Sequence, residues 1–309
     1  MKKIILANPR GFCAGVDRAI TIVEKALEKY GAPVYVRHEV VHNKYVVDGL
    51  KQRVSIFIEE IKDVPESSIL IYSAHGVPLA IREEALAKNL TMVFDATCPL
   101  VSKVHVEIKN LHRQNYTIIM IGHKGHPEVE GTMGQVTDHI HLIENEADID
   151  SLLIPRDIEK IAVVTQTTLS VDETKSIIAK LMQVFSNLRL PKNEDICYAT
   201  QNRQDAVKEM AEYCDVVLVI GSKNSSNSNR LKELAENLGV KAYLIDFDYE
   251  IQGEWLNDAS TVGVTAGASA PEVLVEGVIK RLQQQGFLTT EILNVVEEHM
   301  TFALPSELR

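Results

Sequence analysis

Three cysteines open three similar segments of this 309-residue chain. Cys13 lies in GFCAGVDRA, Cys98 in DATCPLVSK and Cys197 in DICYATQNR. Each cysteine is followed by a helix-like stretch and then by a short apolar run that is typical of a buried strand. The chain therefore reads as one strand–helix unit used three times, and this alternation predicts parallel sheets covered by helices.

Polar residues end two of the strands expected in each unit. The first strand ends 28 or 29 residues after its cysteine, at His42, His126 and Ser225. The second ends 62 to 72 residues after the cysteine, at His75, Thr167 and Ser269. Three units arranged about an axis would bring three thiolates to one point and surround them with six polar strand ends. The pattern predicts a site for a metal cluster and a small polar ligand.

The predicted fold is α/β, with three similar domains in a pseudo-threefold arrangement and mostly parallel sheets. We expect boundaries just before Cys98 and just before Cys197, where LPKNED resembles a linker. The predicted units are residues 1–97, 98–195 and 196–309, and the last includes a C-terminal tail packed on the body. Apolar residues at helical spacing predict a helix in AGVDRAITIVEKALEKYG, and VDETKSIIAKLMQVF and PEVLVEGVIKRLQQQ show the same pattern.

Composition narrows the class of protein. The formal net charge of -11 disfavours nucleic acid and anionic membranes as partners, because both are bound by basic surfaces. No stretch approaches the roughly 18 to 20 apolar residues that span a bilayer, and the apolar run in MKKIILANPRGF is too short for a signal peptide. We expect a cytoplasmic enzyme, in which widely spaced cysteines serve as metal ligands or catalytic thiols instead of disulfides.

The cysteines differ in their surroundings. Cys214 adjoins the apolar run DVVLVIG and fits a small buried hydrophobe. Cys13, Cys98 and Cys197 each lie at a strand-to-helix junction, where the amide groups of a helix start stabilise a thiolate. Three such ligands suit zinc with an open fourth position, or an iron–sulfur cluster with one iron that lacks a protein ligand. The residues alone leave both possibilities open.

The stretch GHKGHPEVEGT carries the candidates for acid–base chemistry. The proline between His126 and Glu128 favours an extended or turn geometry at a strand end, which would point both side chains into one cleft. Glu128 is the candidate proton donor, because burial raises the pKa of a carboxyl group. The alternative is that Glu128 or Glu130 only caps a following helix. His123 and His139 are expected at the surface or behind the site.

Several further polar groups follow strand ends and suit an oxygen-rich anion. Hydroxyl and amide groups at a strand-to-helix turn are typical of phosphate sites, although such runs are also common in plain loops and helix caps. Imidazoles at strand ends add hydrogen-bond donors. The candidates are His42, His75, Thr167, Thr168, Ser225, Ser226, Asn227 and Ser269.

Nine blocks in order, from GFCAGVDRAI through VRHEVVHN, SAHGV, DATCPLV, GHPEVEGTMGQ, TQTTLSVD, DICYATQNRQ and VIGSKNSSNSNRL to GVTAGASAP, resemble the 4-hydroxy-3-methylbut-2-enyl diphosphate reductases, the LytB/IspH family. The resemblance runs from about Lys3 to about Leu308. It implies three α/β domains around a central 4Fe–4S cluster, in which Cys13, Cys98 and Cys197 bind three irons.

The same resemblance implies the reaction. The substrate would be (E)-4-hydroxy-3-methylbut-2-enyl diphosphate, which loses its hydroxyl as water and gives isopentenyl and dimethylallyl diphosphate. Glu128 would donate the proton, assisted by Thr167, and His126 would line the pocket. The residues expected to hold the substrate are His42, His75, His126, Thr167, Thr168, Ser225, Ser226, Asn227 and Ser269. Reduced ferredoxin or flavodoxin would supply electrons, since the chain has no GxGxxG dinucleotide fingerprint.

Two other classes of function stay in view. One is an iron–sulfur sensor without catalysis, which would have no use for six polar strand ends. The other is a zinc-dependent phosphohydrolase that uses the cysteines and histidines.

Overall fold

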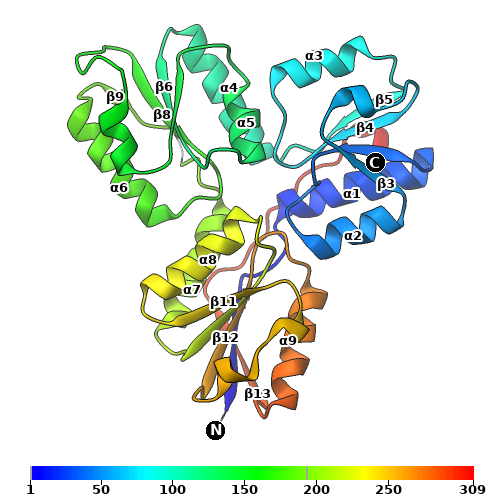
Figure 1. The fold of residues 1–309 in the computed structure, drawn as a ribbon, viewed down its shortest axis with the longest axis vertical. Coiled ribbons are helices and arrows are strands. Elements are labelled where there is room, and N and C mark those ends of the chain that lie inside the picture. The colour runs from blue at the N-terminus through cyan, green and yellow to red at the C-terminus, as the bar shows by residue number, and fades with distance from the viewer. Residues whose placement is uncertain (1, 193) are drawn as a thin grey trace. The chain divides into compact units, whose positions relative to one another are not determined.

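A computed structural model describes residues 2–192 and 194–309 of the chain (Figure 1). In these residues the strands form three parallel sheets. The chain divides into two compact units. Of the described residues, unit 1 contains 2–17, 41–49 and 198–301, and unit 2 contains 18–40, 50–192, 194–197 and 302–309.

Unit 1 is built on a sheet with the strand order β11-β10-β12-β1-β13. Its strands are β1 (Lys3–Asn8), β10 (Val216–Ile220), β11 (Lys241–Ile245), β12 (Thr261–Ala266) and β13 (Thr289–Asn294). Helices α7 (Tyr198–Ala211) and α8 (Ser226–Asn237) cover one face, and α9 (Glu272–Gln284) covers the other (Figure 1). Val216 and Leu218 pack toward α9, whereas Val217 and Val219 pack toward α7 and α8. Burial of both faces explains why β10 is a continuous apolar run.

Unit 2 contains the other two sheets, with the orders β3-β2-β4-β5 and β7-β6-β8-β9. The first has β2 (Val34–Arg37), β3 (Ser55–Ile58), β4 (Ile69–Tyr72) and β5 (Met92–Asp95), with α3 (Leu79–Ala87) after β4. The second has β6 (Thr117–Ile121), β7 (Ile140–Ile143), β8 (Ile161–Thr165) and β9 (Leu188–Arg189). Its helices are α4 (Pro99–Arg113), α5 (Pro127–Met133) and α6 (Val171–Val184).

Helices cover both faces of the β7-β6-β8-β9 sheet, as the spacing of apolar residues in their sequences predicts. Val104 and Ile108 of α4 join Ile118 and Met120 of β6 on one face, and α6 packs on the other face. Ser170 caps α6, because its side chain accepts a hydrogen bond from the Glu173 amide. The helix predicted in VDETKSIIAKLMQVF is therefore confirmed.

The predicted helix after Cys13 is also confirmed as α1 (Ala14–Tyr30), and Gly31 ends it with a φ of 78° that favours glycine. The helix predicted in PEVLVEGVIKRLQQQ is α9, with Pro271 at the position before the first turn. Helices α1 and α2 (Lys44–Gln52) each pass from unit 1 into unit 2. The short 3-10 helices are Ile61–Asp63, Glu146–Ser151, Asp248–Glu250, Gly253–Leu256 and Ser306–Leu308.

The three sheets repeat one strand order. Sheets β3-β2-β4-β5 and β7-β6-β8-β9 follow the same path, and β11-β10-β12-β1 matches them when β1 takes the fourth place. The predicted set of three parallel α/β domains is therefore confirmed, with one sheet in unit 1 and two sheets in unit 2. The prediction that residues 1–97 form one unit is wrong, because β1 lies in the last sheet between β12 and β13. The reason is that each cysteine follows a fourth strand, so the repeat begins after Cys13 and not at the N-terminus.

The C-terminal stretch contains more order than the predicted tail. Strand β13 pairs with β1 in parallel from Lys3 opposite Thr289 to Asn8 opposite Asn294. Its residues are mostly exposed because it forms the edge of the sheet, which is why its sequence lacks an apolar run. Among the described residues, no helix is long and apolar enough to span a bilayer.

Candidate functional site

The three cysteines have equivalent backbone positions. In unit 1 the Cys13 amide donates to the Ala268 carbonyl oxygen at 3.1 Å. In unit 2 the Cys98 amide donates to Ala74 at 2.9 Å, and the Cys197 amide donates to Thr167 at 3.0 Å. Each acceptor lies two residues beyond the end of a strand, namely β12, β4 or β8. The predicted equivalence of the three segments is thus present in the hydrogen bonds.

Each of these cysteines stands directly before a helix: α1, α4 or α7. The first amides of a helix have no partner within it and favour a thiolate beside them. None of the four cysteines forms a disulfide. Cys214 is only 8% exposed among apolar side chains, and burial raises the pKa of its thiol to about 12, so its predicted role as a buried hydrophobe is confirmed.

Within residues 2–192 and 194–309, no three His, Cys, Asp or Glu side chains gather to hold a single metal ion. The donor set suits iron nevertheless in its chemistry, because soft thiolates supported by helix amides are the usual protein ligands of iron–sulfur clusters.

Glu128 is a buried carboxyl group of unit 2 that accepts two hydrogen bonds. It lies in the first turn of α5 and is 4% exposed. Thr167, beyond the end of β8, donates twice to it: the amide reaches Oε1 at 2.6 Å, and the hydroxyl reaches Oε2 at 3.0 Å. The predicted pairing of Glu128 with Thr167 is therefore present.

Two opposing effects set the acidity of Glu128. Burial disfavours the charged form and raises the pKa of this carboxyl group to about 7, while the two Thr167 hydrogen bonds act in the opposite direction. Asp195 adds a smaller effect that also raises the pKa. A carboxyl group balanced in this way is able to exchange a proton near neutral pH.

Pro127 does not produce the extended geometry that its sequence context predicted. It occupies the first position of α5, where its missing amide costs nothing, and Glu128 is helical. The side chain that caps this helix is His126, whose Nδ1 accepts a hydrogen bond from the Glu128 amide at 3.1 Å. A neutral His126 ring then carries its proton on Nε2. The alternative of a capping Glu128 or Glu130 is also wrong, because the residue that caps the helix is His126.

His75 and His126 lie against each other in unit 2. Their rings meet edge to face, with centroids 5.7 Å apart and an interplanar angle of 84°. The Ser73 hydroxyl lies 3.4 Å from His75 Nδ1. Together with Glu128 and Thr167, these imidazoles bring four of the predicted residues into one part of unit 2.

Thr168 accepts a hydrogen bond from Gln166, a residue that the sequence interpretation missed. The fully buried Gln166 donates through Nε2 to the Thr168 hydroxyl at 3.0 Å and accepts the His123 amide at 3.0 Å. His123 thus lies behind the site and His139 at the surface, as predicted. A glutamine directly before two candidate residues, in TQTT, was the available signal.

Two further residues that the sequence interpretation missed, His105 and Gln135, connect α5 and the loop that contains His75. His105 is buried, its Nε2 lies 3.1 Å from the Thr132 hydroxyl, and burial lowers its pKa to about 4, so it is neutral at pH 7. Gln135 donates to the Val77 carbonyl at 2.8 Å. Gly76, with a φ of 80°, leaves room for the His105 ring.

Replacing Gly76 by Ala is expected to lower the free energy of unfolding by about 1–3 kcal/mol, as for overpacked core sites. A Cβ there would lie 2.7 Å from His105 Cε1, and the positive φ adds strain. Chemical denaturation measures the loss. The matched control is Gly49→Ala, because nothing lies within 4 Å of that Cβ and its φ is not positive. Equal stability of Gly76→Ala and the unchanged protein would contradict this account.

In unit 1 the polar candidates gather at the start of α8. Ser225 caps the helix and accepts hydrogen bonds from the Ser228 amide at 3.3 Å and hydroxyl at 3.0 Å, which leaves the Ser225 proton available to a ligand. Asn227 accepts the Ala268 amide at 2.9 Å. Ser226 begins the helix itself.

The remaining two candidates of unit 1 contact each other. The Ser269 hydroxyl donates to the His42 carbonyl oxygen at 2.8 Å, so its proton is used within the protein. Asn224, which the sequence interpretation did not single out, places Nδ2 3.4 Å from His42 Nδ1. The turn from Asn224 to Asn227 therefore offers amides and hydroxyls, with His42 beside Asn224.

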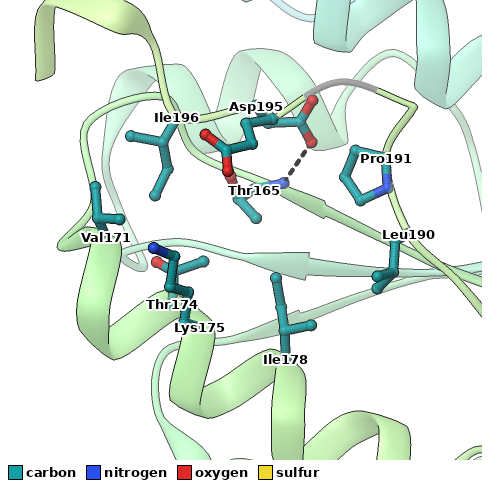
Figure 2. Close-up of a pocket in the computed structure, with 10 residues that line it drawn as sticks. Thr165, Val171, Thr174, Lys175, Ile178, Leu190, Pro191, Asp195 and Ile196 are labelled. Carbon is teal, nitrogen blue, oxygen red and sulfur yellow. Dashed lines mark hydrogen bonds between the residues drawn. The ribbon is translucent and has the colours of Figure 1, made fainter. Parts of the chain in front are cut away.

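A pocket of about 200 Å³ lies elsewhere in unit 2 (Figure 2). Its wall is mostly apolar, with Ile178, Leu190 and Ile196, and none of the predicted site residues lines it. Asp195 lies in its wall and accepts the Thr165 amide at 3.1 Å (Figure 2). Burial raises the pKa of Asp195 to about 6.

Comparison with known proteins now decides the family. Residues 4–283 match the model of a family described as LytB protein. The chain belongs to the LytB family. A relative from Chromobacterium violaceum named 4-hydroxy-3-methylbut-2-enyl diphosphate reductase is 60% identical over 308 residues, which is 100% of this chain and 98% of the relative. A relative of the same name from Acinetobacter baumannii is 57% identical and covers 99% of this chain and 98% of its own.

Solved structures of LytB proteins agree. The E-1-hydroxy-2-methyl-but-2-enyl-4-diphosphate reductase from Plasmodium falciparum has a TM-score of 0.96 and 39% identity, covering 99% of this chain and 96% of that one. A second solved structure, of (E)-4-hydroxy-3-methyl-but-2-enyl diphosphate reductase, has a TM-score of 0.65 and 33% identity. The match covers 92% of this chain and 100% of that one. The family resemblance seen in the sequence is confirmed, and the individual roles of the LytB site residues stay predictions.

Proposed function

We propose that this chain is a 4-hydroxy-3-methylbut-2-enyl diphosphate reductase. It removes the allylic hydroxyl of its substrate as water, with two electrons and two protons, and forms isopentenyl and dimethylallyl diphosphate. The observation that carries this proposal for the chain's own residues is the buried Glu128 held by Thr167, with a pKa of about 7, beside two imidazoles. We place the enzyme in the cytoplasm, where thiols stay reduced.

Cys13, Cys98 and Cys197 would hold a 4Fe–4S cluster. Their placement at three helix starts and the soft character of their sulfurs support this assignment. When bound, the cluster supplies Lewis acidity to the hydroxyl and delivers electrons. Reduced ferredoxin or flavodoxin would bring those electrons.

The net charge of -11 gives the protein no general attraction for an anion. The diphosphate would therefore be held by local hydrogen-bond donors. The start of α8 supplies helix amides and the available proton of Ser225, and Ser226 and Asn227 lie in the same turn. His42 and His75 complete the proposed binding group, with Thr168 supported by Gln166. Ser269 holds the His42 backbone in place by donating to its carbonyl oxygen. Imidazole N–H groups donate hydrogen bonds to the diphosphate without a lysine or arginine.

Glu128 would act as the proton donor. Burial keeps its carboxyl group protonated up to neutral pH, and the two hydrogen bonds from Thr167 stabilise the carboxylate once the proton has left. His126, whose Nδ1 accepts the Glu128 amide, would use Nε2 to donate a hydrogen bond to the substrate. The leaving hydroxyl thus departs as water, which is a far better leaving group than hydroxide.

The test is anaerobic reconstitution with iron and sulfide, followed by consumption of the diphosphate alcohol with a chemical reductant. We expect a brown protein that consumes the substrate and forms both alkenyl diphosphates. Stoichiometric zinc with release of phosphate would favour the phosphohydrolase, and a cluster without binding of the substrate would favour the sensor.

The turnover number is expected to fall above about pH 7, by roughly tenfold per pH unit well above the pKa of Glu128. The donor form is the protonated one, and burial raises its pKa from 4.5 to about 7, so the acid is lost as the pH rises through 7. The same shift makes the folded protein bind the proton more tightly than the unfolded chain. Its contribution to stability is complete below pH 4.5 and disappears as the pH rises through 7. Rates between pH 6 and 9 with saturating reductant measure this profile, and a flat profile would count against Glu128 as the donor.

A further inference from the structure

A basic residue stands five or six positions after each cluster cysteine: Arg18, Lys103 and Arg203. Each lies on the helix that follows its cysteine, which is α1, α4 or α7. None of the three is used by the proposed mechanism. Their side chains donate to the backbone just before a different cysteine, in a regular order along the chain.

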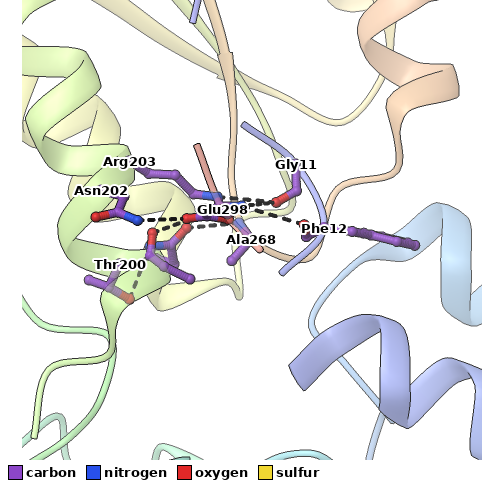
Figure 3. A network of polar contacts seen from close by, with 9 residues as sticks. Gly11, Phe12, Thr200, Asn202, Arg203, Ala268 and Glu298 are labelled. Atoms are coloured by element: carbon purple, nitrogen blue, oxygen red, sulfur yellow. Dashed lines mark hydrogen bonds and ion pairs between the residues drawn. The ribbon is translucent and has the colours of Figure 1, made fainter. Parts of the chain in front are cut away.

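Arg203 shows the contact most completely. Its side chain is fully buried, and it donates to the Gly11 carbonyl oxygen from Nε at 3.1 Å and from Nη2 at 2.7 Å (Figure 3). Nη2 also reaches the Phe12 carbonyl at 3.4 Å. Gly11 and Phe12 directly precede Cys13, so a residue of the helix after Cys197 fixes the approach to Cys13.

Arg18 makes the corresponding contact in unit 2. It donates to the Thr97 carbonyl from Nη1 at 3.2 Å and to the Asp95 carbonyl from Nη2 at 3.4 Å. Burial lowers the pKa of Arg18, while Asp95 and Cys98 raise it, which places its charge near that thiol. The helix after Cys13 therefore fixes the approach to Cys98.

Lys103 completes the order. Its Nζ donates to the Glu194 carbonyl at 2.9 Å and lies 3.4 Å from Asp195 Oδ1. The Asp195 carboxyl group is fully buried and also accepts the Thr165 amide. The helix after Cys98 therefore fixes the approach to Cys197.

Carboxylates accompany these cations. Asp195, in the segment before Cys197, pairs with Lys103. Asp95, in the segment before Cys98, raises the pKa of Arg18, although its own carboxylate forms an ion pair with Arg82 at 2.7 Å. The segment before Cys13 has no acidic residue. Glu298, from the chain beyond β13, supplies the missing charge. It pairs with Arg203 through both oxygens, at 2.9 and 3.2 Å, and accepts Asn202 Nδ2 at 3.0 Å (Figure 3). A paired, hydrogen-bonded geometry of this kind is what a buried charge requires.

We propose that Arg18, Lys103 and Arg203 are positioning residues of the cluster site. Each cation fixes the backbone before another cysteine: Arg18 before Cys98, Lys103 before Cys197 and Arg203 before Cys13. Glu298 is the counter-ion that the Cys13 segment lacks. The inference rests on the proposed function. A thiolate binds metal at full strength only when its backbone is held in place, and groups behind the ligands commonly change metal affinity by 10–100-fold. Arginine is suited to this role because its planar fork reaches several carbonyls at once.

The order of contacts gives a signature that general destabilisation does not produce. In full-length protein kept anaerobic, hydrogen exchange is measured in the three peptides that end at Cys13, Cys98 and Cys197. Arg18→Gln is expected to speed exchange before Cys98 and not before Cys13, about tenfold for the loss of a charged hydrogen bond. Lys103→Gln is expected to act before Cys197, and Arg203→Lys before Cys13.

Glu298→Gln tests the Cys13 arm with a smaller change, in case Arg203→Lys does not fold. Its matched control is Glu291→Gln, which removes an exposed ion pair with Lys3 from the same C-terminal segment. After reconstitution, iron loss to a chelator is expected to be at least about tenfold faster in the four variants and unchanged in the control. Exchange that rises equally before all three cysteines, or stays at the control level, overturns the inference. An unchanged protein that takes up no iron overturns the cluster itself, while the exchange pattern still reports the positioning separately.

Discussion

Replacing Glu128 by Gln is expected to lower the turnover number by about 10²–10⁴-fold, the usual contribution of a positioned general acid. The amide has nearly the same shape as the carboxyl group, so α5 and its His126 cap should stay in place. What is lost is the transferable proton. In addition, Thr167 presents two donors to two oxygens, and a glutamine side chain has only one oxygen to accept them.

The measurement is steady-state reduction of the diphosphate alcohol under anaerobic conditions, with iron and sulfide content determined on the same sample. We expect an unchanged cluster content and a fall in kcat much larger than any change in KM, because the proton is needed in the transition state. Glu130→Gln is the matched control, since Glu130 lies on the same helix but is exposed. Full activity of Glu128→Gln would remove this carboxyl group from the mechanism.

The part of the fold that sequence reasoning predicts well is the part set by local patterns. Apolar runs such as β10 and the helical spacing of α1 arise because both faces of a parallel sheet are covered, and that requirement is written into neighbouring residues. The place of β1 is different. Its partners β12 and β13 lie at the other end of the chain, and pairing between distant strands leaves no periodic signal.

The site divides in the same way. The cysteines, the strand-end histidines and Glu128 were predicted because each follows a strand, and strand ends meet at one edge of a sheet. The error at Pro127 came from weighing its effect on the preceding residue above its suitability for a first helical turn. Gln166, His105 and Arg203 were missed because they bind protein groups and not the ligand. For Arg203 the signal was present, since a cation follows each cysteine at nearly the same distance.

Replacing any one of Cys13, Cys98 and Cys197 by Ser is expected to abolish the cluster and the turnover. A serine hydroxyl remains protonated at neutral pH and is a hard, poor ligand, whereas iron–sulfur clusters are held by soft thiolates. A 4Fe–4S cluster held by three thiolates would have one iron without a protein ligand, and the loss of one cysteine would leave two of its four irons without one. Iron and sulfide analysis after reconstitution, together with the visible absorption of the cluster, measures the loss directly.

Cys214→Ala separates ligation from the general effect of removing a thiol. Cys214 is buried against Met210 in the core of unit 1, and burial raises the pKa of its thiol to about 12, so it stays protonated and apolar. We expect this variant to bind iron and to turn over normally, with a cost of about 1 kcal/mol in unfolding free energy for the small cavity. Because the Cys13, Cys98 and Cys197 amides make the same backbone contact, their serine variants should fail to the same degree. A serine variant that keeps both its iron and its turnover would show that the corresponding sulfur does not bind the cluster.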